Sequence, residues 1–77
     1  LTGLPNRRAF IEELERRLAR DAPISLLMID LDGFKQINER HGRAVGDRML
    51  TRVGFRLRTA APGLFVARMA GDEFAVL

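Results

Sequence analysis

The chain contains no cysteine, tryptophan or tyrosine among its 77 residues. Without cysteine, it has no disulfide framework and no cysteine-ligated zinc site. Its longest unbroken apolar runs, such as Leu26–Ile29, are far shorter than the roughly 20 residues that a transmembrane helix needs. Residues 1–18 alternate charged and apolar side chains, unlike the apolar centre of a secretory signal. These absences favour a small globular domain that folds around an apolar core.

The composition agrees, with 47% hydrophobic and 30% charged residues. A chain this short forms at most one domain and buries only about two thirds of its unfolded surface. Its 13 basic residues outnumber 10 acidic ones, which gives a net charge of +3, and all the basic residues except Lys35 are arginines. This excess favours anionic partners such as nucleotides, nucleic acid or a membrane surface, although genome composition alone explains most of the arginines.

The spacing of apolar residues predicts a helix, a strand, two helices and a hairpin, in that order. Asn6 can cap an amphipathic helix of about 14 residues that ends near Pro23. The apolar segment Ile24–Leu31 predicts a strand buried on both faces, in the middle of a sheet. Further helices are predicted from Phe34 to His41 and from Ala44 to about Thr59.

Two apolar runs near the end of the chain predict a β-hairpin. Leu64–Met69 and Glu73–Leu77 are expected to be its strands, and Ala70–Asp72 its tight turn. The fold class is therefore α/β of the α+β kind, a mixed sheet with helices packed on at least one face. Because the chain stops inside an apolar strand, we expect it to be part of a longer domain.

Acidic residues gather at two places that this arrangement would bring together. Asp30 and Asp32 lie at the end of the predicted central strand, and both would lie on one side if the strand continued that far. Asp72 and Glu73 lie in or beside the hairpin turn. If the hairpin pairs with the strand at 24–31, the four carboxylates converge, and such a cluster would bind Mg²⁺ for phosphoryl or nucleotidyl transfer. A solvated strand end and an ordinary Gly-Asp turn explain the same residues without any function.

Other polar residues suit a nucleotide. Lys35 begins a predicted helix, where an ammonium group and free N–H groups can bind phosphate. Asn38 and Asp47 offer donors and acceptors that complement a guanine edge. All three residue types are also common on helix surfaces and at helix ends. His41, the sole histidine, has no second histidine nearby and is a weak candidate ligand.

Four motifs together resemble the GGDEF domain of diguanylate cyclases. They occur in the family's order and spacing, at Leu1–Arg8 (LTGLPNRR), Asp30–Asn38 (DLDGFKQIN), Gly46–Asp47 and Arg68–Phe74 (RMAGDEF). The resemblance implies a palm-like fold related to nucleotidyl cyclases, with residues 1–77 forming a partial domain that lacks the downstream strands and helix. It also implies condensation of two GTP molecules to cyclic di-GMP and two pyrophosphates. The reaction would take place in a homodimer whose facing active sites each hold one GTP.

The resemblance assigns metal and catalytic roles residue by residue. Asp30, the Leu31 carbonyl, Asp72 and Glu73 would bind Mg²⁺, with Mn²⁺ as an alternative. Asp72 and Glu73 would also serve in catalysis, Asp72 by helping to activate the ribose 3′-hydroxyl. Asp32 belongs to the motif, but a structural role is expected for it.

The remaining motif residues would bind the substrate. Lys35 would contact the terminal phosphates and stabilise the charge of the leaving pyrophosphate. Asn38 and Asp47 would recognise guanine, and Arg43 would meet a phosphate or the base. Gly71 would let the backbone approach the phosphates closely.

The sequence departs from the family pattern at three places. Ala70 stands where the signature usually has glycine, and its methyl group would crowd the nucleotide or restrict φ. His41–Arg43 replaces an aromatic residue followed by Gly-His. Ala61 and Leu64 occupy the positions of the Arg and Asp of the family's inhibitory site, so we predict no product feedback through it.

Two further functions stay open. The first is a catalytically degenerate GGDEF domain that acts as a GTP-binding regulatory module, for example fused to a cyclic di-GMP phosphodiesterase domain. The second, a nucleic-acid-binding domain, is disfavoured because the five phenylalanines are the only aromatic residues available for stacking. The resemblance implies a cytoplasmic domain without its own membrane segment, in a protein with unseen sensor or phosphodiesterase domains.

Overall fold

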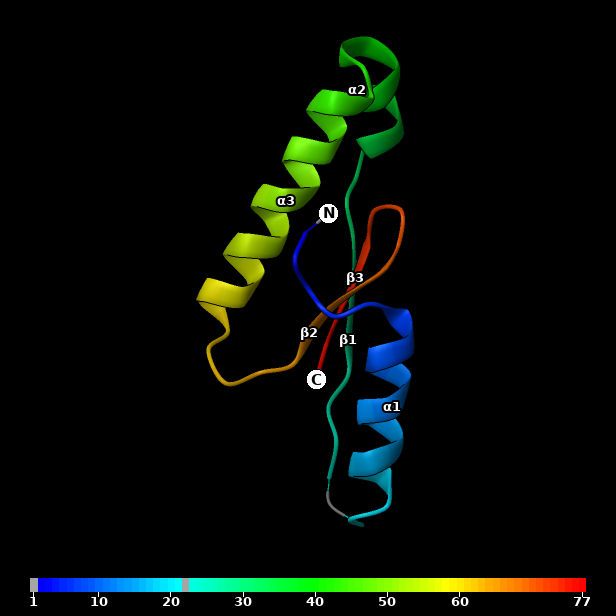
Figure 1. Cartoon of the computed structure of the whole chain (residues 1–77), viewed down its shortest axis with the longest axis vertical. Coiled ribbons are helices and arrows are strands. Elements are labelled where there is room, and N and C mark those ends of the chain that lie inside the picture. The colour runs from blue at the N-terminus through cyan, green and yellow to red at the C-terminus, as the bar shows by residue number, and fades with distance from the viewer. Residues whose placement is uncertain (1, 22) are drawn as a thin grey trace.

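The computed structural model describes residues 2–21 and 23–77, so Leu1 of the first motif and Ala22 near the predicted helix end lie outside it. Along the chain, the elements are α1 (Arg7–Leu18), β1 (Leu27–Asp30), α2 (Phe34–His41), α3 (Arg43–Ala60), β2 (Val66–Ala70) and β3 (Glu73–Val76). Helices and an antiparallel sheet share one chain, which confirms the α+β class. The molecule measures 46 × 20 × 19 Å, because α1 and α2 extend past opposite ends of the short sheet (Figure 1).

The first helix begins where its cap predicts. The side chain of Asn6 accepts a hydrogen bond from the Ala9 N–H at 2.9 Å, which satisfies one of the free donors of the first turn. Further along the helix, the Glu13 carboxylate pairs with Arg16 and, at 2.8 Å, with Arg17. The helix spans 12 residues and ends at Leu18, earlier than the predicted end near Pro23.

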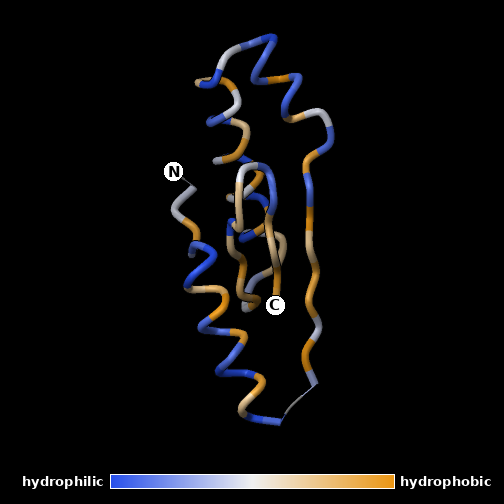
Figure 2. Tube along the Cα trace, turned by 90° about the vertical axis from the view of Figure 1, so that its right-hand side faces the viewer, coloured by the Kyte–Doolittle hydropathy of each residue, from blue (hydrophilic) through white to orange (hydrophobic). Residues whose placement is uncertain are grey.

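The three strands lie in the order β1-β3-β2 and pair antiparallel throughout. The predicted hairpin is confirmed, since β2 and β3 pair across the turn. The prediction of a central strand at 24–31 is wrong for this structure: β1 has four residues, pairs only with β3, and leaves Leu27 58% and Met28 52% exposed. The central strand is β3 instead, and its Phe74 and Ala75 are fully buried. An apolar run indicates that a strand favours burial, but it does not identify the neighbours that bury it; Figure 2 shows β1 as a largely hydrophobic trace along one side.

Both faces of the hairpin are covered. Ala67 of β2 and Ala75 of β3 lie opposite each other and pack against Phe10 of α1. The rings of Phe10 and Phe65 lie 6.4 Å apart in a tilted arrangement, which adds aromatic contact to this cluster. Because side chains alternate along a strand, Phe74 points to the opposite face from Ala75. The core therefore lies in and around the hairpin, and it fixes the strands that carry the signature motif.

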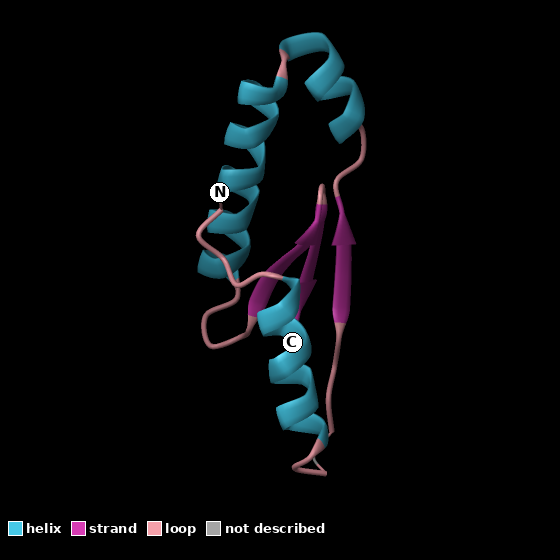
Figure 3. Cartoon of the chain, turned by 45° about the vertical axis from the view of Figure 1, so that its right-hand side comes forward, coloured by secondary structure: helices cyan, strands magenta, loops and turns pink. Residues whose placement is uncertain are grey.

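A helical corner joins α2 to α3. Gly42 has φ 88° and ψ 164°, a conformation open essentially only to glycine. Its N–H donates to the Asn38 carbonyl at 2.9 Å, and its carbonyl accepts from Gly46 N–H at 3.3 Å, so it ends one helix and begins the next. Figure 3 shows the two helices meeting at this corner, beyond the end of the sheet. No helix in the described part of the chain is long and apolar enough to cross a membrane.

Candidate active site at the hairpin turn

The end of β1 lies beside the hairpin turn. Asp30 is the register partner of Glu73, and the Leu31 N–H donates to the Asp72 carbonyl at 3.2 Å. Directly opposite residues of an antiparallel pair have Cβ atoms about 4.5–5.5 Å apart on the same face. The predicted approach of the turn to the strand end is therefore confirmed, and it places Asp30 and Glu73 opposite each other on the same face of the sheet.

The convergence of all four carboxylates is not observed. The strand ends at Asp30, so the alternation that would have aligned Asp32 with it does not continue, and Asp32 lies exposed in the following turn. Asp72 lies in the turn directly before Glu73, the first residue of β3, but among residues 2–21 and 23–77 no three Asp, Glu or His side chains lie close enough together to hold a metal. The structure thus pairs Asp30 with Glu73 and places Asp72 next to Glu73 in the chain.

The donors at this place nevertheless suit a hard cation. They are carboxylate and carbonyl oxygens, the ligands that Mg²⁺ prefers, and Mg²⁺ commonly takes only one or two carboxylates together with substrate phosphates. Like charges directly opposite in a sheet repel each other. The ion pairs found in the described part of the chain both lie within α1, so no cationic side chain neutralises Asp30 and Glu73. The residues present therefore fit Mg²⁺.

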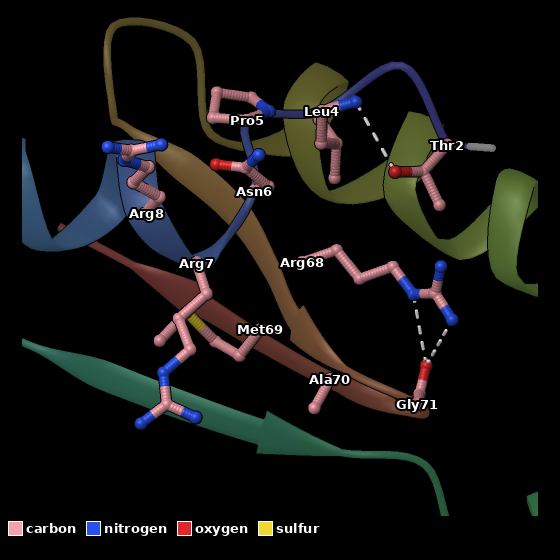
Figure 4. A pocket seen from close by; sticks show the side chains of 10 residues that line it. All are labelled: Thr2, Leu4, Pro5, Asn6, Arg7, Arg8, Arg68, Met69, Ala70 and Gly71. Atoms are coloured by element: carbon pink, nitrogen blue, oxygen red, sulfur yellow. Dashed lines mark hydrogen bonds between the residues drawn. The ribbon is translucent and has the colours of Figure 1, made fainter.

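The turn itself has well-defined geometry. Gly71 has φ 46°, in the left-handed region, while the pairing of β2 with β3 shifts register between Arg68 and Ala70. The Arg68 guanidinium donates from Nε and Nη2 to the Gly71 carbonyl, at 3.1 and 2.9 Å. These residues border an open hollow of about 410 Å³ between the hairpin and the N-terminal segment around Pro5 (Figure 4). The sequence reasoning gave Arg68 no role; its place two residues before the signature was the available signal.

Ala70 does not strain the turn. Among the described residues, Asp21 is the only non-glycine residue with positive φ, so Ala70 adopts a backbone conformation open to any L residue. Ala70 is also exposed and pairs with Glu73. The conformational requirement for glycine falls on Gly71, which the sequence retains. Restriction of φ is therefore no obstacle at Ala70.

The packing of α2 on α3 brings Asn38 against Gly46, the residue directly before Asp47. The Asn38 amide lies against the backbone of Gly46, where an added Cβ would come within 2.8 Å of the Asn38 Cγ and would overlap Oδ1. Asn38 Oδ1 is buried and has no hydrogen-bond partner among the residues that the structure describes. Asp47 follows Gly46 directly and is half-buried. Sequence reasoning paired Asn38 with Asp47, but only the structure reveals that Gly46 makes room for the amide.

The two candidate phosphate-binding cations lie at helix starts. Lys35 is the second residue of α2, which follows Gly33 in the left-handed conformation, and its side chain is exposed. Arg43 is the first residue of α3 and is also exposed. Figure 3 shows α2 rising from the end of β1, so Lys35 lies at the same end of the sheet as the carboxylate pair. Neither cation makes an ion pair with the acidic residues in the described part of the chain.

Comparisons with known proteins point to one family. The family described as "Diguanylate cyclase, GGDEF domain" matches residues 1–77. Diguanylate cyclase DgcP of Escherichia coli is 49% identical over 82 residues, covering 100% of this chain and 24% of DgcP. Diguanylate cyclase TpbB of Pseudomonas aeruginosa is 47% identical over 83 residues, covering 100% of this chain and 19% of TpbB.

Solved structures agree with the sequence matches. The GGDEF domain of PA1120 from Pseudomonas aeruginosa has a TM-score of 0.85 at 46% identity, covering 99% of this chain and 50% of that one. The GGDEF domain of DgcB from Caulobacter crescentus, solved in complex with c-di-GMP, has a TM-score of 0.88 at 40% identity, covering 97% of this chain and 46% of that one. The chain thus spans a quarter or less of the two curated relatives and about half of these two solved chains.

Proposed function

Because the chain belongs to the GGDEF-domain family of diguanylate cyclases, we propose that it forms the catalytic-motif part of an enzyme that makes cyclic di-GMP. The reaction would condense two GTP molecules and release two pyrophosphates, with Mg²⁺ as cofactor and Mn²⁺ as a substitute. A domain that consumes GTP would work in the cytoplasm. Sensor or phosphodiesterase domains in the same protein would control it.

One observation carries the proposal. Asp30 and Glu73 are register partners, and a hydrogen bond from Leu31 N–H joins the end of β1 to the Asp72 carbonyl. Acidic residues from segments far apart in sequence are thus held at one end of the sheet, where oxygen ligands favour a hard cation. This arrangement supports a metal site formed by Asp30, the Leu31 carbonyl, Asp72 and Glu73, completed by substrate phosphates.

The chain's own residues would then divide the chemistry. Asp72 accepts the proton of the ribose 3′-hydroxyl, and the 3′-oxygen attacks the α-phosphorus of the other GTP. The bond from that phosphorus to the pyrophosphate oxygen breaks, and the Lys35 ammonium stabilises the charge that develops on the leaving group. Glu73 assists at the metal site. When bound, Mg²⁺ supplies charge neutralisation at the reacting phosphates.

Guanine recognition is proposed for Asn38 and Asp47. Asn38 has an unsatisfied amide oxygen, and a buried acceptor without a donor indicates a missing partner. Asp47, the fifth residue of α3, adds a carboxylate acceptor for guanine N–H groups. Arg43 at the start of α3 would contact a phosphate or the base. Gly71 would allow close approach of the turn to the phosphates.

A homodimer follows from the chemistry of the proposed reaction. One site holds one GTP, and each 3′-oxygen must reach the α-phosphorus of a second GTP. Two copies facing each other through their active-site surfaces would meet this requirement and form both bonds of the cyclic product. The dimer is therefore part of the proposal.

The alternative is a GTP-binding regulatory domain without catalytic activity. Ala70, at the position where the signature usually has glycine, suggests this alternative. The unstrained backbone of Ala70 weighs against it, as does the presence of Asp30, Lys35, Asp72 and Glu73 together. Incubation of the full-length protein with GTP and Mg²⁺, with Asp72→Asn as the control, separates the two. Cyclic di-GMP formed by the unsubstituted protein and lost in the variant supports catalysis, whereas GTP binding without product in both supports the regulatory domain.

A further inference from the structure

Two successive carbonyl groups of the hairpin turn are held by hydrogen bonds. The Gly71 carbonyl accepts from Nε and Nη2 of Arg68, at 3.1 and 2.9 Å. The Asp72 carbonyl accepts from the N–H of Leu31, at 3.2 Å. Figure 4 shows the Arg68 side chain extending along the hairpin to the Gly71 oxygen.

These two carbonyls belong to the peptide planes on either side of Asp72. The plane between Gly71 and Asp72 carries the Gly71 oxygen, and the plane between Asp72 and Glu73 carries the Asp72 oxygen. Each peptide unit is rigid, so the backbone of Asp72 can move only by rotation about its own φ and ψ. Holding both planes fixes both rotations, and with them the direction in which the Asp72 side chain leaves the backbone.

The Arg68 guanidinium is well suited to fixing the orientation of the Gly71 carbonyl. A guanidinium is planar and presents its N–H groups in a rigid fork, so two of them reaching one oxygen fix its direction as well as its distance. Arg68 is itself anchored, because its backbone N–H donates to the Pro5 carbonyl at 3.0 Å. Arg68 therefore connects the turn to the N-terminal segment through hydrogen bonds.

We propose that Arg68 is a positioning residue for the reaction: its guanidinium orients the Gly71–Asp72 peptide and thereby aims the Asp72 carboxylate at the metal and the 3′-hydroxyl. This inference rests on the proposed function of Asp72. It assigns Arg68 no contact with GTP, which distinguishes it from Lys35. A small misplacement of a catalytic group costs up to about a hundredfold in rate.

The test compares the full-length protein with Arg68→Ala and Arg68→Lys. Lysine keeps the charge and the backbone N–H but lacks the rigid fork of donors. Arg8→Ala is the matched control, since Arg8 borders the same hollow but makes no hydrogen bond to the turn within the described residues. Each variant is measured for kcat and KM with GTP, for Mn²⁺ affinity by electron paramagnetic resonance with a non-hydrolysable GTP analogue, and for its thermal midpoint.

We expect Arg68→Ala to lower kcat by about tenfold to a hundredfold, with KM for GTP changed less than about twofold. Its Mn²⁺ affinity should fall by about threefold or more, because Asp72 no longer faces the ion in one orientation. Arg68→Lys should stay folded with an unchanged thermal midpoint. Its kcat and Mn²⁺ affinity should lie between those of Arg68→Ala and the unsubstituted protein. Arg8→Ala should match the unsubstituted protein in every measurement.

Three results would overturn the inference. A rise in KM with unchanged kcat would make Arg68 a substrate-binding residue. A lower thermal midpoint with unchanged kcat and Mn²⁺ affinity per folded molecule would make its role purely structural. If the unsubstituted protein makes no cyclic di-GMP, the proposed catalysis fails first, and Mn²⁺ affinity then decides alone: equal affinity in Arg68→Lys, Arg68→Ala and the unsubstituted protein rejects the positioning role.

Discussion

Replacing Gly46 with alanine should disable guanine recognition without touching a residue that contacts guanine. The added Cβ would lie 2.8 Å from Asn38 Cγ and would overlap Oδ1, so the Asn38 amide must leave its position. Overpacking of this kind costs about 1–3 kcal/mol of stability. The gain in helix propensity from glycine to alanine returns about 1 kcal/mol. The free energy of unfolding should therefore fall by no more than about 2 kcal/mol, and the protein stays folded.

Gly46→Ala should affect nucleotide affinity more than it affects folding. A hydrogen bond that a buried polar group can no longer make costs about 1–3 kcal/mol, which corresponds to about 5- to 150-fold in Kd. We expect Gly46→Ala to weaken binding of a non-hydrolysable GTP analogue within that range. Discrimination against the matching ATP analogue should decrease as well, because the lost contact reads the base.

The matched control is Gly54→Ala on the same helix. There the added Cβ would lie 3.1 Å from Leu4 Cδ1, the mobile end of a side chain that can shift by a few tenths of an ångström. Isothermal titration calorimetry of both variants with both analogues decides the matter. Equal GTP affinity in Gly46→Ala and the unsubstituted protein, or equal losses in the two variants, would refute the steric reasoning.

The remaining predictions concern the cap, an ion pair and product feedback. Asn6→Ala should lower the free energy of unfolding by about 1 kcal/mol in urea titrations, because the Ala9 N–H loses its acceptor; an unchanged midpoint would contradict the cap. The hydrogen bond from Arg17 holds the pKa of Glu13 below its usual 4.5. The stability that this contributes is present above pH 4.5 and is lost as the pH falls through the lowered pKa. Between pH 4.5 and the lowered pKa, the free energy of unfolding of Glu13→Gln should therefore decrease less than that of the unsubstituted protein. Cyclic di-GMP should not inhibit through the turn that holds Ala61 and Leu64, and Ala61→Arg combined with Leu64→Asp should introduce such inhibition; low-micromolar inhibition of the unsubstituted protein that is lost on mutation of this turn would contradict this.

Most elements could be read from the sequence because local chemistry determines them. Asn6 can cap only a helix that starts at the next residue, and the Gly-Asp turn between two apolar runs favours a hairpin. The position of β1 in the sheet could not be predicted from the sequence, because strand order depends on which strands pair in the folded structure. The apolar pattern of Ile24–Leu31 looks the same in a central strand and in an edge strand with one partner.

For the candidate site, the sequence predicts that the hairpin turn approaches the end of β1, but not how the acidic residues are arranged there. The motif residues Asp30 and Glu73 meet as expected, because the hairpin pairs with β1. Asp32 does not join them, because β1 ends at Asp30. Sequence patterns do not locate the end of a strand to within one residue. The hydrogen bonds of Arg68 to the Gly71 carbonyl depend on the conformation of the turn, and the space over Gly46 depends on how α2 packs on α3, so neither follows from residue spacing.

We propose above all that this chain carries the catalytic motifs of a Mg²⁺-dependent diguanylate cyclase. This is tested by incubating the purified full-length protein with GTP and Mg²⁺ and quantifying nucleotides by chromatography with mass spectrometry. We expect cyclic di-GMP with two pyrophosphates for each molecule formed, and no product after chelation of the metal or in Asp72→Asn. GTP bound but not converted, even when the protein is dimeric and Mg²⁺ is in excess, would contradict it.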